Sequence, residues 1–227
     1  MSRGVFVTGT DTGVGKTLAA CALLHALRAR GVAACPMKPI AAGARGRDGR
    51  WINEDTEALL LAAGWPAERA TDVTPILLRE PMAPHIAAAR EGCTIDIARV
   101  EASFANLASQ GFVVVEGVGG FRVPLGRDHD SADLAVTLGL PVILVVGMRL
   151  GCLNHALLTQ EAVKARGLAL AGWIASAIDP EMPASEENVT ALRERIPAPL
   201  LGLIPHSPLP DARRAARSLD IASLLPV

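Results

Sequence analysis

Short apolar runs recur along the chain, and each is too short to form a helix. Gly or Pro punctuation follows each run, which is typical of buried strands in a parallel sheet. We therefore predict strands over 5–7, 32–37, 112–115, 141–146 and 200–204.

Longer stretches with helical spacing alternate with these strands, and a Gly just beyond each stretch supplies a left-handed cap. This alternation predicts an α/β fold with a doubly wound, mainly parallel sheet and helices on both faces. Ligands of such sheets bind beyond the carboxyl ends of the strands. The predicted helices are Lys16–Arg30, Asp55–Ala63, Ile95–Ser109 and Asn154–Arg166.

Two breaks interrupt the alternation, and neither is long enough to separate domains. The segment 41–50, rich in Gly and Arg, is predicted to be a mobile loop, and 180–185 is a second break. Half of the 227 residues are apolar, which suffices for one large core. We therefore predict a single domain over residues 1–227.

The charge balance argues against nucleic acid as a partner. The formal net charge is -1, from 22 basic and 23 acidic residues without a long run of either sign, so we expect small-molecule partners. The four cysteines lie far apart, which argues against a zinc site or a disulfide framework and favours a reducing cytoplasm. The most apolar stretch, 167–178, is shorter than the roughly 18 residues of a membrane span, so we expect a cytoplasmic protein without an export or membrane segment.

The strongest chemical signal is a phosphate-binding loop, or P-loop, over Gly9–Thr17, directly between the first strand and the first helix. Its glycines let backbone N–H groups turn toward phosphates, Lys16 can reach the β- and γ-phosphates, and the Thr17 hydroxyl can hold Mg²⁺. The strict pattern requires Gly at position 10, where this chain has Thr. A Gly-rich turn without a ligand is the alternative.

Three further polar residues follow strands or open a helix. Glu116 ends a predicted strand before four residues rich in Gly, which favours a magnesium ligand, although loop N–H groups could satisfy this acid instead. Lys38 follows the second strand, and Pro39 biases it toward an extended backbone that aims its ammonium between the γ-phosphate and an anionic substrate. A solvated lysine is the alternative. Asp55 lies in a first helical turn, where the helix dipole alone explains an acid.

The P-loop resembles the group with the signature K-G-G-x-G-K-[ST], in which an extra Lys acts on the nucleotide of a partner subunit. Asp11 occupies the position of that Lys. This departure points away from partition and targeting ATPases and toward relatives that transfer the phosphoryl group to a small substrate.

The chain carries an ordered set of motifs: 9–17, Lys38-Pro39, Pro84-His85, 115–120, 141–147, 150–155 and Gly172-Trp173. This set resembles the dethiobiotin synthetase family over about residues 5–205. The resemblance implies a P-loop NTPase fold and the conversion of 7,8-diaminononanoate (7,8-diaminopelargonate), CO₂ and Mg-ATP into dethiobiotin, ADP and phosphate, in biotin biosynthesis. It also implies a carbamate and a carbamic-phosphoric anhydride as intermediates.

The same resemblance implies the role of each site residue. Lys16 and Lys38 would stabilise the transferring phosphoryl group, and Thr17, Asp55 and Glu116 would hold Mg²⁺. ATP contacts fall on Gly13, Val14, Gly15, Lys16, Thr17, Leu18, Asp55, Glu116, Gly117, Val118, Gly119, Ser176, Ala177, Pro205, His206 and Ser207. Substrate contacts fall on Thr12, Lys38, Ala42, Gly151, Cys152, Leu153 and Asn154.

A homodimer is also implied, because in this family the segment 151–154 receives the carboxylate tail of a substrate held by the neighbouring subunit. Without the resemblance, Asn154 would be interpreted as a helix N-cap. Two positions depart from the family: Ala42 replaces a frequent Ser, and Ser176-Ala177 replace an Asn-containing turn that contacts the purine, which leaves the preference for ATP open. His85 and His206 are predicted to be structural, because the reaction needs no histidine relay.

Two other functions remain as alternatives. The first is a nucleotide-dependent switch of the partition or metallocentre-assembly type, against which Asp11 counts. The second is the ATP-using part of a cobyrinate-type amidotransferase, which would require a separate subunit to supply ammonia. ATP turnover that depends on a diamine would favour the synthetase.

Overall fold

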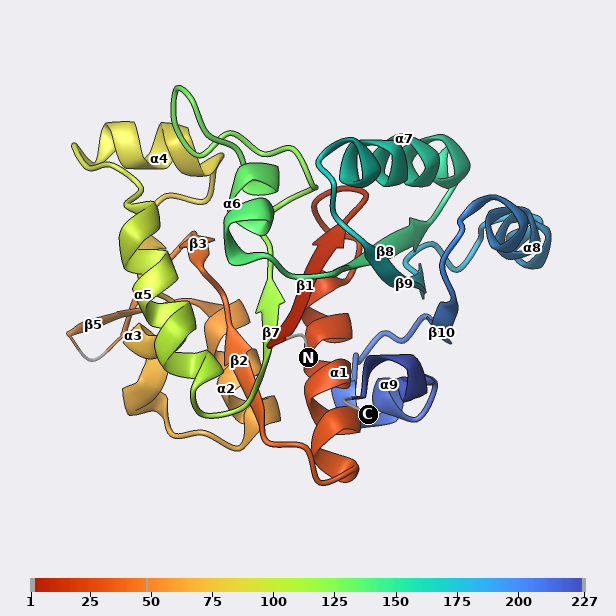
Figure 1. The fold of residues 1–227 in the computed structure, drawn as a ribbon, viewed down its shortest axis with the longest axis horizontal. Helices are drawn as coiled ribbons and strands as arrows, with labels where there is room; N and C mark the ends of the chain where they lie inside the picture. Colours follow the sequence, from red (N-terminus) through yellow and green to blue (C-terminus); the bar gives the residue numbers. More distant parts are fainter. Residues whose placement is uncertain (1–2, 48, 226–227) are drawn as a thin grey trace.

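A six-stranded parallel sheet forms the centre of the computed structural model, which describes residues 3–47 and 49–225 (Figure 1). The strand order is β10-β9-β8-β1-β7-β2, so the first strand lies inside the sheet, between β8 and β7. All carboxyl ends therefore meet at one edge. The strands are β1 (Gly4–Gly9), β2 (Ala34–Met37), β7 (Phe112–Glu116), β8 (Val142–Met148), β9 (Leu170–Ala177) and β10 (Leu200–Ile204).

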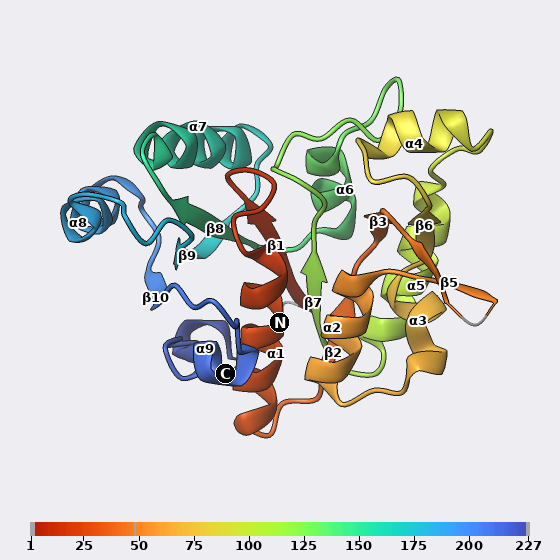
Figure 2. The ribbon, with the colours of Figure 1, turned by 180° about the vertical axis from the view of Figure 1, so that it is seen from behind.

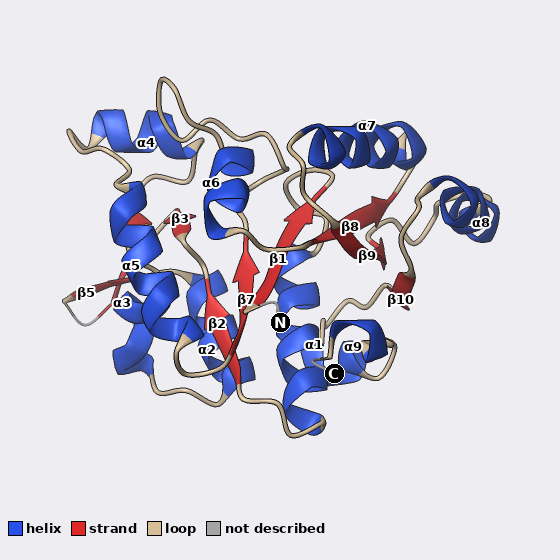
Figure 3. Cartoon of the chain, in the orientation of Figure 1, coloured by secondary structure: helices blue, strands red, loops and turns tan. Residues whose placement is uncertain are grey.

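Helices cover both faces of this sheet, because successive strand residues point to opposite sides. Val5 and Val7 pack in one cluster with α1, α2 and α9, whereas Phe6 packs in another with α4, α5 and α6. A third cluster joins β8 and β9 to α7 and α8. Figure 2 shows α1, α2 and α9 in front of the sheet, and Figure 3 shows the strands enclosed between helices.

The described residues also form two small sheets of two strands each. Parallel β3 (Ile40–Ala42) and β6 (Ile76–Leu78) extend the region beyond β2, and antiparallel β4 (Arg45–Arg47) and β5 (Arg50–Ile52) form a ribbon beside α2. The helices are α1 (Lys16–Ala29), α2 (Glu54–Ala63), α3 (Ala70–Val73), α4 (Pro84–Arg90), α5 (Ile97–Ala108), α6 (Ser131–Leu138), α7 (Cys152–Ala165), α8 (Ser185–Arg195) and α9 (Ala212–Ala216), with 3-10 turns at Ala67–Arg69 and Ala222–Leu224.

The five predicted strands and four predicted helices are confirmed, with ends that differ by one or two residues. Two predictions are wrong. The segment 41–50 is not a plain loop, because it contains the end of β3, all of β4 and the start of β5; residue 48 lies outside the described residues. Asn154 is not an N-cap, because α7 begins at Cys152 and its N-cap is Gly151, whose φ of 93° only glycine adopts easily.

Several elements that the sequence pattern did not predict also form. The apolar stretch 167–178 contains β9, and α6 begins at a capping box in which Asp130 and Asp133 accept from each other's backbone N–H.

Cys21, Cys35, Cys93 and Cys152 are free thiols. Within the described residues, no helix combines the length and the apolar character that crossing a membrane demands.

Candidate active site

The P-loop connects β1 to α1 in a conformation that requires glycine. Gly13 and Gly15 have φ values of 75° and 88°, in the left-handed region. A Cβ built on Gly15 would also lie 2.7 Å from Oγ of Ser176, so β9 packs directly behind the loop. The loop is therefore fixed both by backbone conformation and by contact with a neighbouring strand.

Lys16 lies at the base of this loop and is almost fully buried, at 7% exposed. Its Nζ donates to the carbonyl oxygen of Asp11 at 2.7 Å. Burial lowers the pKa of Lys16 to about 8, and the nearby ammonium of Lys38 acts in the same direction, against the opposing effect of Glu116. A negatively charged ligand would compensate this desolvated cation.

Thr17 and two carboxylates meet at the start of α1, although they come from three parts of the chain. The Thr17 hydroxyl lies 2.9 Å from Oδ1 of Asp55 and 2.8 Å from Oε1 of Glu116. Asn53 positions Asp55 by capping α2, since its side chain accepts from the N–H groups of Asp55 and Thr56. The fold thus brings together the three predicted magnesium ligands.

Lys38 lies at the same point and is 3% exposed. Its Nζ is 2.7 Å from Oε1 of Glu116 and 2.8 Å from Oδ2 of Asp55. Although burial disfavours the ammonium, these two carboxylates raise the pKa of Lys38, and Lys38 in turn holds the pKa of Asp55 below its usual value against the effect of burial. The alternative that Lys38 is an ordinary solvated lysine is therefore wrong.

The oxygen atoms of this cluster fit a hard divalent cation. Oε2 of Glu116 is buried without a hydrogen-bond partner in the structure, and a carboxylate oxygen in that state is a ready ligand. No group of three or more His, Cys, Asp or Glu side chains that could hold a metal occurs within 3–47 and 49–225. Mg²⁺ suits such a site, because it commonly takes one or two carboxylates together with water and substrate phosphates.

The loop after β7 lies beside the P-loop, as the Gly-rich sequence there predicts. The carbonyl oxygen of Gly117 is 3.5 Å from Nζ of Lys38, and a Cβ on Gly119 would lie 3.5 Å from Oγ1 of Thr12. Val118 is half-buried between them, and Thr12 is exposed. These residues and the P-loop share one edge of the sheet.

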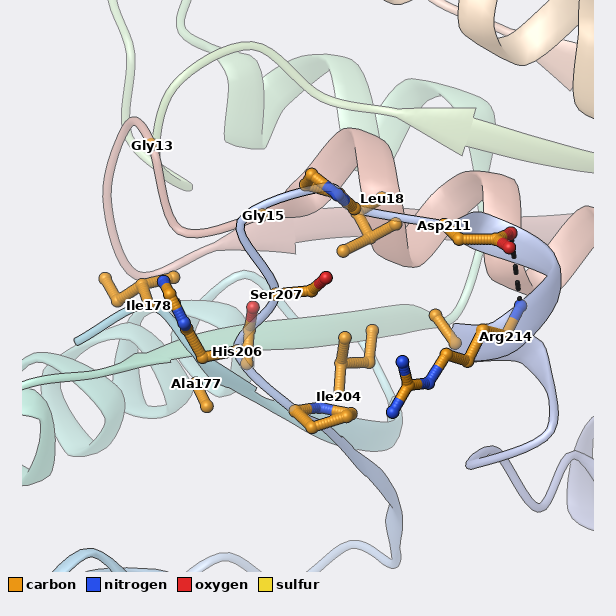
Figure 4. Close-up of a pocket in the computed structure, with 14 residues that line it drawn as sticks. Gly13, Gly15, Leu18, Ala177, Ile178, Ile204, His206, Ser207, Asp211 and Arg214 are labelled. Atoms are coloured by element: carbon orange, nitrogen blue, oxygen red, sulfur yellow. Dashed lines mark hydrogen bonds between the residues drawn. The ribbon is translucent and has the colours of Figure 1, made fainter. Parts of the chain in front are cut away.

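A cavity of about 310 Å³ adjoins the opposite side of the P-loop (Figure 4). Its size and mixed lining suit a nucleotide base. Eight of its lining residues are predicted ATP contacts: Gly13, Gly15, Leu18, Ser176, Ala177, Pro205, His206 and Ser207. Six others were missed, and four of them lie in the weakly patterned last twenty residues: Ile178, Ile204, Pro210, Asp211, Arg214 and Ala215.

Val14 and the two predicted structural histidines lie in different surroundings. Val14 is buried in the hydrophobic core beneath the P-loop, so only its backbone can meet a phosphate. Nδ1 of His85 lies 3.2 Å from the carbonyl oxygen of Pro124, and His206 is an exposed residue that lines the cavity beside the P-loop.

The predicted substrate contacts fall into two separate groups. Ala42 ends β3, where its carbonyl oxygen accepts from Nδ2 of Asn53 at 3.4 Å, close to the α2 terminus that carries Asp55. The segment 151–154 instead follows β8, which is three strand spacings, roughly 14 Å, from β2 and Lys38. Cys152 is buried and Asn154 is exposed.

The sheet order, the loop and the buried lysine and carboxylates define a P-loop NTPase. A family profile described as an AAA domain matches residues 3–214. The septum site-determining protein MinD of Pyrococcus horikoshii, solved with Mg-ADP, has a TM-score of 0.56 at 20% identity and covers 92% of this chain and 83% of its own. The MinC:MinD complex of Aquifex aeolicus gives 0.53 at 17% identity, over 96% and 86%. These likenesses establish the fold.

A much higher similarity identifies the family within that class. The chain is 58% identical over 221 residues to an ATP-dependent dethiobiotin synthetase, BioD, of Aromatoleum aromaticum, which spans 96% of this chain and 97% of the relative. This chain belongs to the dethiobiotin synthetase family. It is an ATP-dependent ligase of biotin biosynthesis.

Proposed function

We propose that this enzyme makes dethiobiotin from 7,8-diaminononanoate, CO₂ and ATP in one crevice at the carboxyl edge of the sheet. The observation that carries the proposal is a buried pair of lysines beside a P-loop: Lys38 pairs directly with Asp55 and Glu116, and the charges of these two carboxylates also act on Lys16. The 58% identity to a dethiobiotin synthetase supports the product. The cavity on the other side of the loop supports a nucleotide as the phosphoryl donor.

Phosphorylation activates a carbamate that is otherwise a poor electrophile. One amine adds to CO₂ and loses a proton, which gives the carbamate anion. A carbamate oxygen then attacks the γ-phosphorus, and the bond to the β-γ bridging oxygen breaks to release ADP. The second amine attacks the carbonyl carbon of this carbamic-phosphoric anhydride, loses a proton and expels phosphate, which closes the ureido ring.

For these reaction steps the protein has to position the reacting groups and supply positive charge. The chemistry requires no protein nucleophile. Ring closure is intramolecular, and oriented reactions of this kind reach effective molarities on the order of 10⁵ M. Lys16, at the base of the P-loop, would bind the β- and γ-phosphates. Lys38 would meet the phosphoryl group from the side of the carbamate, because it follows β2 and not the P-loop, and it pairs with both Asp55 and Glu116.

Thr17, Asp55 and Glu116 would hold Mg²⁺, which would neutralise phosphate charge during transfer. The Thr17 hydroxyl and the partnerless Oε2 of Glu116 are the oxygen atoms that favour this assignment. Asn53 keeps the Asp55 carboxylate at the site by fixing the start of α2. Loss of that cap would therefore affect the metal site as well as the helix.

The position of segment 151–154 supports a homodimer in which each subunit binds the carboxylate tail of its partner's substrate. In the arrangement that the family implies, the first turn of α7, which follows a strand three places from β2, would bind the carboxylate tail of a substrate whose amines lie at Lys38 of the partner subunit. Helix N-termini bind carboxylates readily. We assign segment 151–154 to the substrate of the partner subunit, mainly through backbone N–H groups, since the Cys152 side chain is buried. Residues 1–227 would form one P-loop NTPase domain of that dimer.

The test is an assay of purified protein with Mg-ATP, bicarbonate and 7,8-diaminononanoate, with product detected by mass spectrometry. The proposal requires dethiobiotin and ADP in equal amounts, and ATP turnover that depends on the diamine. ATP turnover that instead requires a protein partner would favour the switch ATPase.

A further inference from the structure

An ion pair outside the proposed metal site joins the P-loop to the turn before α7. Nη2 of Arg149 lies 2.5 Å from Oδ2 of Asp11, although the two residues are 138 positions apart. Asp11 follows β1 and Arg149 follows β8, and these strands are neighbours in the sheet. Figures 1 and 2 both show the P-loop beneath one end of α7.

Asp11 accepts hydrogen bonds through three different atoms, two of them from residues of the P-loop. Oδ1 accepts from the backbone N–H of Thr12 at 2.7 Å, Oδ2 accepts from Arg149, and the carbonyl oxygen accepts from Nζ of Lys16 at 2.7 Å. The conformation of this residue therefore affects both Thr12 and Lys16, which we assign to substrate and phosphate. Its carboxylate also places a negative charge in a loop that must receive a triphosphate, and Arg149 neutralises that charge.

Arg149 also contributes to the start of α7. Its carbonyl oxygen accepts from the backbone N–H of Cys152 at 3.0 Å, which closes the turn around Gly151, the N-cap of this helix. The side chain and the backbone of one residue thus connect the P-loop to segment 151–154. Nothing in the local sequence pattern predicts this link.

We propose that Arg149 is a positioning residue, which neutralises Asp11 and holds the P-loop in the conformation that receives the triphosphate. The predicted effect on dethiobiotin formation rests on the proposed function, whereas the predicted effect on nucleotide binding does not. The two side chains are 42% and 47% exposed, and an exposed ion pair contributes little to folding stability. A positioning role therefore predicts a loss of nucleotide binding and turnover with little change in melting temperature.

The experiment compares Arg149→Ala, Arg149→Lys, Asp11→Asn and the double variant Asp11→Asn/Arg149→Ala in the whole protein. Four quantities are measured: Kd for a non-hydrolysable ATP analogue with Mg²⁺, kcat and KM for dethiobiotin formation, and Tm. Arg195→Ala is the matched control, because Arg195 is 52% exposed and pairs with Glu194 on α8, away from the P-loop.

Arg149→Ala weakens analogue binding about tenfold, because it leaves the Asp11 carboxylate without a counter-charge. Adding Asp11→Asn recovers much of that affinity, Arg149→Lys retains most of it, and Arg195→Ala matches the wild type. The proposal is overturned if Arg149→Ala binds and turns over normally, if its losses follow a fall in Tm, or if Asp11→Asn fails to recover binding. A wild type that binds the analogue but forms no dethiobiotin would instead refute the proposed function.

Discussion

Nζ of Lys38 lies 2.7 Å from Oε1 of Glu116, at the ends of two neighbouring strands and 78 positions apart in the sequence. Both groups are almost completely buried. A buried charge pair of this kind is costly to break, because the remaining partner keeps an uncompensated charge. The parallel pairing of β2 with β7 therefore delivers a cation and an anion to one point, beside the P-loop.

Removal of the Lys38 ammonium separates nucleotide binding from chemistry. We predict that Lys38→Ala binds ATP within a fewfold of the wild type but lowers kcat by about 100-fold or more, since its charge acts on the transferring group. Equilibrium binding and single-turnover assays measure the two effects. Equal losses in affinity and turnover would argue that Lys38 has no specific part in the reaction.

Gly15 tests whether the P-loop conformation is essential. Gly15→Ala places a Cβ at a φ of 88° and 2.7 Å from Oγ of Ser176, a strain of about 1–3 kcal/mol in the loop itself. We predict that ATP binding weakens about tenfold or more. Gly167→Ala is the control, because Gly167 also has a positive φ of 70° but a Cβ added there would meet no atom within 4 Å. Similar ATP affinities in the two variants would contradict the assignment.

The carboxylates predict a specific dependence on magnesium. Glu116→Gln removes the charge of the buried oxygen that lacks a partner, and we expect the half-saturating Mg²⁺ concentration to rise about tenfold or more. Glu101→Gln, on the exposed side of α5, leaves that concentration unchanged. Mg²⁺ titrations of turnover at fixed ATP provide the measurement. A Glu116→Gln enzyme with an unaltered titration would exclude Glu116 as a ligand.

The cavity behind the P-loop predicts a selective effect on ATP. Ala177 lines this cavity of about 310 Å³, so Ala177→Phe occupies space that we assign to the base. The KM for ATP should rise about tenfold, because the variant loses contacts that bind ATP equally in the ground state and the transition state. The KM for the diamine should change by less than about twofold. Initial-rate kinetics with each substrate varied in turn decide this. An equal rise in both values would place the base elsewhere.

Local signals predicted five of the six strands of the main sheet and the P-loop, because each depends on a short run of residues. The position of Asp55 could not be predicted in this way: its approach to Thr17 depends on how α2 packs against α1 across 38 positions. The ribbon of β4 and β5 was missed because its strands have three residues each, and five of the six are exposed. Asp211 and Arg214 were missed because α9 has only five residues and a weak pattern.

The most direct test of the proposed reaction follows the carbon of labelled bicarbonate into the product. Purified enzyme with Mg-ATP, ¹³C-bicarbonate and 7,8-diaminononanoate should yield dethiobiotin that carries the label in its ureido carbonyl, with one ADP released for each product molecule. ATP hydrolysis that proceeds without the diamine and yields no labelled product would contradict the account.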